Sequence, residues 1–169
     1  MTALKLSERQ PKLYTLITLT LFGVLMYISQ VIMSALPNIE IVTLLIILVT
    51  RKFGVRAIYS VYVFAFCEIL TYGIHIWAIN YLYVWTILLL AILPIRKIDN
   101  IFLYTVIAGI FGLLFGTLCS IPYFITGGFA FGLSYIISGI PFDFMHLIGN
   151  VLTTALLYKP LTIIMNKIK

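Results

Sequence analysis

Residues 138–150 read Ser-Gly-Ile-Pro-Phe-Asp-Phe-Met-His-Leu-Ile-Gly-Asn, and this stretch places polar side chains in an otherwise apolar region. Gly139 and Pro141 predict that a helix begins here, because proline fixes the φ angle of a first helical position. Asp143, His146 and Asn150 follow at a spacing that puts them on one face of this helix. We expect this face to take part in the function of the protein.

The composition is that of an integral membrane protein. Of the 169 residues, 63% are hydrophobic and 9% are charged, whereas soluble domains are about 25% charged. The mean hydropathy is +1.16. Several apolar runs are long enough to cross a hydrocarbon core of about 30 Å. We therefore predict a single all-α integral membrane domain, residues 1–169, that crosses the membrane several times.

The apolar runs predict six transmembrane helices, at about residues 12–36, 39–52, 57–72, 76–93, 101–121 and 141–165. Segment 124–140 is rich in glycine, so we expect a re-entrant or interfacial segment on the outer side before the last helix. If the N and C termini are cytoplasmic, six crossings place all 11 Lys and Arg residues on the inner side. The run 39–52 is short, so either Arg51 and Lys52 snorkel or the corner at 37–40 dips below the surface.

Three acidic residues, Glu40, Glu68 and Asp143, fall toward the predicted outer half, without Lys or Arg near them in the sequence. An acid inside a membrane segment needs a partner, a proton or a wet cavity. The acids favour a ligand that is cationic, donates hydrogen bonds or contains a metal. The predicted substrate-binding residues are Asn38, Glu40, Glu68, Tyr72, His75, Trp77, Asn80, Asp143, His146 and Asn150.

Structural roles remain open for several of these residues. Asn38, Glu40 and Asp143 are residue types that cap helices. Aromatic residues from Trp77 to Trp85 could form a belt at the membrane interface. If they stack on a flat ligand instead, Trp77 and Tyr81 are better placed than Trp85.

Small residues recur every four positions along segment 101–121, a pattern typical of helices that approach one another closely. Gly23 offers a similar small surface in the first segment. The residues that we expect to serve helix packing or docking are Gly23, Ala108, Gly112, Gly116 and Ser120.

Signatures of other functions are weak. The two cysteines are isolated, so neither a metal site nor a redox centre is expected. The chain has no phosphate-binding loop, and its basic residues do not form the stripe typical of nucleic-acid binding. Two alternatives stay open: a stand-alone proton-coupled transporter using Glu68 or Asp143, and a small intramembrane enzyme using Ser134, Asp143 or His146.

The chain resembles the substrate-binding S components of energy-coupling factor (ECF) transporters in four features. These are six short helices, the corner at 36–40 (Leu-Pro-Asn-Ile-Glu), the stripe of small residues at 108–120 and residues 139–143 (Gly-Ile-Pro-Phe-Asp). The resemblance implies a prokaryotic protein of the cytoplasmic membrane that binds a vitamin or related micronutrient at its outer face. Its partners would be a transmembrane T component and two cytoplasmic ATPases. ATP and Mg would be used by those ATPases, and this chain would bind no cofactor and would not be an enzyme.

The first helix departs from the pattern of the family, which often carries alanine-x-x-x-alanine there for docking on the T component. In this region the chain has Thr15, Thr18, Thr20 and Gly23, which are also small enough for close helix contact. By analogy with the family, segment 127–139 would act as a lid, and the loaded bundle would topple in the membrane to release its ligand inward.

Overall fold

The computed structural model describes residues 13–36 and 38–168, and this part of the chain is all-helical, without strands. Its α-helices are α2 (Leu13–Met33), α3 (Val42–Phe53), α4 (Ile58–Tyr72), α5 (Ile76–Ile92), α6 (Ile101–Cys119) and α7 (Ile121–Lys167), with short 3-10 helices η1 (Gly54–Ala57) and η2 (Leu93–Ile95). In the described ranges, five helical stretches are long and apolar enough to cross a membrane, and one of them, Val42–Tyr72, joins α3, η1 and α4. An all-helical membrane protein is therefore confirmed, while the number of crossings and the sidedness of the ends stay predictions.

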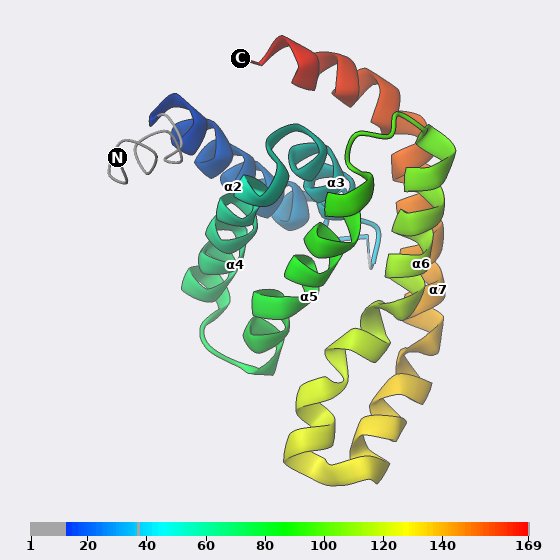
Figure 1. The fold of residues 1–169 in the computed structure, drawn as a ribbon. Helices are drawn as coiled ribbons and strands as arrows, with labels where there is room; N and C mark the ends of the chain where they lie inside the picture. The colour runs from blue at the N-terminus through cyan, green and yellow to red at the C-terminus, as the bar shows by residue number, and fades with distance from the viewer. Residues whose placement is uncertain (1–12, 37, 169) are drawn as a thin grey trace, which may run out of the picture.

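The helices α6 and α7 form a long hairpin, and its closed end extends beyond the other helices (Figure 1). The chain reverses at Gly128, whose φ of 76° and ψ of −176° interrupt α7 in a region that essentially only glycine occupies. Across the turn, the rings of Tyr123 and Tyr135 stack with centroids 4.0 Å apart. The hairpin is thus closed by a glycine turn and an aromatic pair.

The prediction that the last helix begins at 141 is wrong, because the helix that follows the break at Gly128 runs on through this position. The re-entrant or interfacial placement of segment 124–140 stays a prediction. Helix α7 continues through Pro141 and Pro160. A proline removes one helical hydrogen bond, but helices packed against neighbours in a membrane tolerate that loss. The packing of α6 along α7 supplies such a neighbour here.

Helix α3 is the buried centre of the bundle, and every residue in 42–50 is buried. Its 12 residues make it about 18 Å long, shorter than a hydrocarbon core of about 30 Å. It begins inside the bundle because the corner before it packs against α7. A Cβ added to Gly149 would lie 3.1 Å from the backbone oxygen of Asn38 and 3.2 Å from Cα of Ile39. This packing favours the alternative in which the corner lies below the membrane surface over the one in which Arg51 and Lys52 snorkel.

Small residues allow three close helix contacts within the chain. A Cβ on Gly23 would lie 2.6 Å from the backbone oxygen of Ser60 in α4. On α6, a Cβ on Gly112 would lie 2.8 Å from the backbone of His146, and one on Gly116 would lie 2.6 Å from the carboxylate of Asp143. The small stripe of α6 therefore packs on α7, and Gly23 packs on α4.

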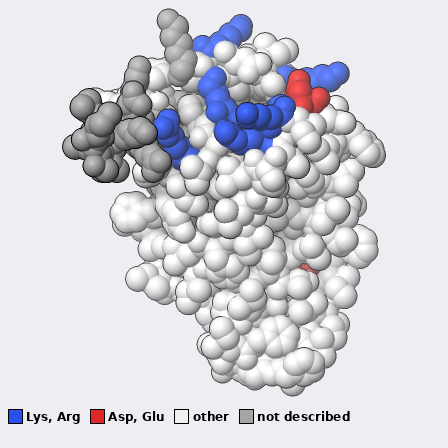
Figure 2. Space-filling model, in the orientation of Figure 1, with Lys and Arg blue, Asp and Glu red and all other residues white. Residues whose placement is uncertain are grey.

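The Lys and Arg side chains gather at one end of the face shown in Figure 2, at the end opposite the tip of the hairpin. Helix α3 ends here, α6 begins here and α7 ends here. We call this the basic end.

Candidate ligand-binding cavity

A cavity of about 340 Å³ lies toward the end of the bundle opposite the basic end. The ends of α2 and α4, the start of α5 and the corner before α3 surround it, and α6 and α7 each contribute one residue. The corner before α3 reaches the cavity through Asn38, Ile39 and Glu40. The cavity is lined by Gln30, Met33, Ser34, Leu36, Asn38, Ile39, Glu40, Glu68, Tyr72, His75, Trp77, Ala78, Tyr81, Trp85, Phe115 and His146.

Most of the residues predicted to bind substrate meet at this cavity. Those that line it are Asn38, Glu40, Glu68, Tyr72, His75, Trp77 and His146. They come from three separate parts of the chain: the corner before α3, the α4 to α5 connection with the helix ends beside it, and the middle of α7. Segment 127–139 does not line the cavity, so the predicted lid lies away from it in this structure.

Three predicted residues do not line the cavity. Asp143 and Asn150 join α7 to α6, and Asn80 is bonded within α5. Asp143 accepts a hydrogen bond of 2.9 Å from the backbone N–H of Gly116, so it bridges α7 to α6 and does not cap its own helix. Asn150 donates to the backbone oxygen of Ala108, 3.1 Å away. Asn80 accepts from the hydroxyl of Tyr83 at 2.9 Å. In this structure Asn80, Asp143 and Asn150 are thus bonded within the protein, and their role in ligand binding stays a prediction.

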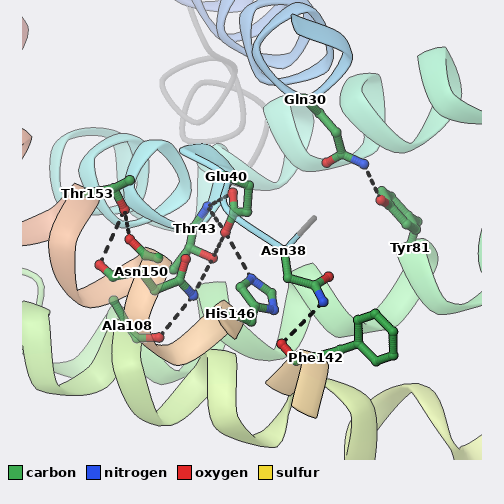
Figure 3. A network of polar contacts seen from close by, with 11 residues as sticks. Gln30, Asn38, Glu40, Thr43, Tyr81, Ala108, Phe142, His146, Asn150 and Thr153 are labelled. Carbon is green, nitrogen blue, oxygen red and sulfur yellow. Dashed lines mark hydrogen bonds and ion pairs between the residues drawn. The ribbon is translucent and has the colours of Figure 1, made fainter. Parts of the chain in front are cut away.

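Glu40 and His146 form the polar floor of the cavity (Figure 3). Glu40 is 8% exposed, and its carboxylate accepts the backbone N–H of Thr43 at 2.9 Å and also the hydroxyl of Thr43. Negative charge is favourable at this place, because the start of α3 presents free N–H groups. His146 Nε2 lies 3.2 Å from Glu40 Oε1. The carboxylate is therefore both a cap for α3 and a wall of the cavity.

The corner that carries Glu40 is fixed by Asn38. Asn38 has a φ of 57°, a left-handed conformation that asparagine tolerates better than most residues. Its amide donates to the backbone oxygen of Phe142 at 3.2 Å, and Figure 3 shows this contact beside the pair of Glu40 and His146. The corner is thereby held against α7.

Glu68 of α4 brings a second carboxylate to the cavity. The residue is 8% exposed, and its Oε1 is buried without a hydrogen-bond partner among the described residues. A buried carboxylate oxygen without a partner is costly. A ligand that donates a hydrogen bond or carries positive charge would remove this cost.

One wall of the cavity is aromatic. Trp77, Tyr81 and Trp85 follow at intervals of four residues on one face of α5, with centroids 6.2 Å and 5.8 Å apart along the series. Trp85 continues the wall to Phe115 of α6 at 5.4 Å, and Gln30 donates to the hydroxyl of Tyr81. The sequence favours Trp77 and Tyr81 over Trp85 for stacking, whereas in the structure Trp85 also lines the cavity. Its spacing of eight residues from Trp77 places both on one face of a helix and is the sequence signal for this.

As far as the structure describes the chain, the lining contains two carboxylates and neither Lys nor Arg. Its electrostatic potential therefore favours positive charge. Among the described residues, no group of three His, Cys, Asp or Glu side chains is arranged to hold a metal ion. The cavity can therefore accept hydrogen bonds at its carboxylates and pack flat groups against its aromatic side chains.

Comparisons of the chain with protein-family models, with curated proteins and with solved structures found no match. Function is therefore inferred from the cavity and from the residues that line it.

Proposed function

We propose that the protein is the substrate-binding membrane subunit of an ECF-type importer and captures a vitamin, or a related micronutrient or precursor. The observation that carries the proposal is the Oε1 of Glu68, which has no hydrogen-bond partner within residues 13–36 and 38–168, at a cavity of about 340 Å³. Small-molecule sites are typically cavities of this size with apolar walls and a few placed polar groups. The resemblance of residues 36–40 supports the ECF assignment, because Asn38 and Glu40 of this corner line the cavity.

The lining favours a ligand that carries a positive or hydrogen-bond-donating group on a flat, unsaturated ring. Glu40 already accepts from Thr43 and lies beside His146, so Glu68 is the carboxylate with free capacity. The ring would lie on the wall of Trp77 and Tyr81, where aromatic faces attract flat groups and cations.

In this proposal the chain binds and its partners drive transport. The ligand would enter from the side opposite the basic end, which the distribution of Lys and Arg predicts to be the outer side. A transmembrane T component and two cytoplasmic ATPases would then supply the conformational change and hydrolyse ATP.

The first experiment identifies the ligand. Small molecules that co-purify with the protein are detected by mass spectrometry, and a thermal-shift panel of vitamins and precursors, cationic and anionic, follows. We expect stabilisation by cationic or donor-rich members. Tight binding of a dicarboxylate or a phosphate ester at neutral pH would overturn the charge preference. Absence of any ligand, together with no complex with a T component and its ATPases, would overturn the assignment.

The second experiment tests the role of Glu68. We expect Glu68→Gln to weaken a cationic ligand by roughly thirtyfold or more, because one partner of a buried charge pair is lost. Asp143→Asn is the matched control, since this acid contacts Gly116 and does not line the cavity. Equal affinities in wild type and Glu68→Gln would show that Glu68 does not contact the ligand.

A stand-alone carrier is the second candidate, because a buried acid without a partner is also a feature of proton relays. Uptake into proteoliposomes decides between the two. Uptake that needs the T component, the ATPases and ATP supports the importer, whereas uptake by this chain alone that collapses with the pH gradient supports the carrier.

A further inference from the structure

A second cavity, of about 220 Å³, lies at the basic end, away from the proposed ligand site. It forms where the end of α3, the connection from η2 to α6 and the last turns of α7 meet. Its polar lining residues are Arg51, Lys52, Arg96, Asp99, Thr162 and Asn166. Within residues 13–36 and 38–168, three side chains with positive charge thus share this cavity with a single carboxylate.

The carboxylate of Asp99 does not neutralise the cavity. It is engaged with Arg51 Nη2 at 3.0 Å and with the hydroxyl of Tyr158 at 3.2 Å. The side chain of Asp99 is 75% exposed to solvent, whereas that of Arg51 is 14% exposed. Solvent screens an exposed charge more strongly than a buried one, so the cavity keeps an excess of positive charge.

Two of the basic side chains are held in place by the fold. The Arg51 guanidinium lies 4.9 Å from the ring centroid of Tyr104 and 5.3 Å from that of Tyr158, which are cation–π distances. Lys52 Nζ donates to the backbone oxygens of Met165 and Ile168, each 2.6 Å away. Lys52 therefore also satisfies carbonyl groups at the C-terminal end of α7.

Several hydrogen-bond donors at this cavity have no acceptor in the part of the chain that the structure describes. Arg51 Nε and Thr162 Oγ1 are buried without a partner among the described residues. The guanidinium of Arg96 makes no hydrogen bond or ion pair with another described residue and packs on Gly54, where a Cβ would lie 2.5 Å from Nη1. A group with several acceptor oxygens and negative charge would satisfy such donors, and arginine is well suited to phosphate.

We propose that this cavity binds a phosphate group, either that of an anionic phospholipid headgroup or that of a free phosphorylated compound. Basic pockets between transmembrane helices at the cytoplasmic surface bind lipid phosphates in this way. The positive-inside distribution predicts that this end faces the cytoplasm. The site is separate from the proposed ligand cavity, because the two share none of the described lining residues.

The test uses the full chain in phosphatidylcholine vesicles with or without phosphatidylglycerol. Lipid retained by the purified protein is measured by native mass spectrometry, and thermal unfolding is measured with and without inorganic phosphate. Preferential retention of phosphatidylglycerol without an effect of phosphate identifies the headgroup as the source. Stabilisation by phosphate without a lipid preference identifies a free compound. Either result supports the site, and neither preference nor stabilisation overturns it.

Paired variants separate the cavity from diffuse surface charge. Arg96→Gln should weaken binding of the anion by about tenfold, equivalent to about 1.4 kcal/mol, because a charged donor is lost from the cavity. Lys97→Gln removes the same charge from an exposed neighbour that does not line the cavity and should have little effect. Thr162→Val, which removes one donor and no charge, should also weaken binding. Equal effects of Arg96→Gln and Lys97→Gln would overturn the proposal.

Discussion

Replacing Gly112 by alanine tests whether the contact between α6 and α7 positions the floor of the ligand cavity. A Cβ at Gly112 would lie 2.8 Å from the backbone carbon and oxygen of His146 and 2.9 Å from the backbone N of Leu147. These atoms belong to the α7 backbone and cannot rotate away. Ordinary van der Waals contact begins near 3.4 Å, so the two helices must separate by about 0.6 Å.

The separation has a cost in stability and a cost in binding. Overpacking of this kind destabilises by about 1–3 kcal/mol, and the better helix propensity of alanine returns about 1 kcal/mol. The net loss of up to about 2 kcal/mol should lower Tm by up to about 8 °C. A shift of His146 by the same amount would stretch its 3.2 Å contact with Glu40 to about 3.8 Å, beyond hydrogen-bond range. Ligand affinity should therefore fall together with Tm.

The assay is thermal unfolding of the purified protein in detergent, with ligand binding measured in parallel. Gly139→Ala is the matched control, because Gly139 lies in α7 and a Cβ there would meet no atom within 4 Å. The control should leave Tm unchanged or raise it. A Gly112→Ala protein with the Tm and affinity of the wild type would refute the argument from helix contact.

Two further predictions use the same purified protein. Gly128→Ala should lower Tm and speed limited proteolysis at the hairpin tip, because the φ of 76° and ψ of −176° cost a non-glycine residue about 1–3 kcal/mol; proteolysis at the rate of the Gly139→Ala control would contradict this. Asn150→Ala should destabilise by about 1–3 kcal/mol through its lost bonds to Ala108 and Thr43 and leave ligand affinity unchanged. A loss of affinity without a loss of stability would return Asn150 to the ligand site.

The position of the turn shows where local sequence signals conflict. Pro141 and the glycine before it are a typical helix start, and Gly128 is one of several glycines in the same region. The structure puts the reversal at Gly128 and keeps Pro141 inside α7. In a helix interior, glycine is about 1 kcal/mol and proline about 3 kcal/mol less favourable than alanine. The free energy gained from packing along a whole helix can exceed both values. The choice between the two breaks is therefore made by the contact of α6 with α7.

The roles of the polar stripe on α7 show a second limit. Asp143, His146 and Asn150 share one helical face, and periodicity predicts no more than that. This face meets α6 at Gly116 and Ala108, and the corner before α3 at Glu40. Only His146 of the three lines the cavity. Which neighbour each side chain meets depends on the rotation and height of α7 in the bundle.

The sequence by itself determined that this is an all-helical membrane protein, because an apolar chain in lipid must satisfy its backbone hydrogen bonds within helices. It also pointed to the corner at 36–40 and to the acids and aromatic residues that line one cavity. Only the tertiary structure decided where the cavity lies. The corner packs against Gly149, α3 starts inside the bundle, and the space left beyond it is walled by residues from five helices and that corner. Such an arrangement depends on contacts between segments far apart in the chain. Neither the spacing of residues within one segment nor the composition predicts these contacts.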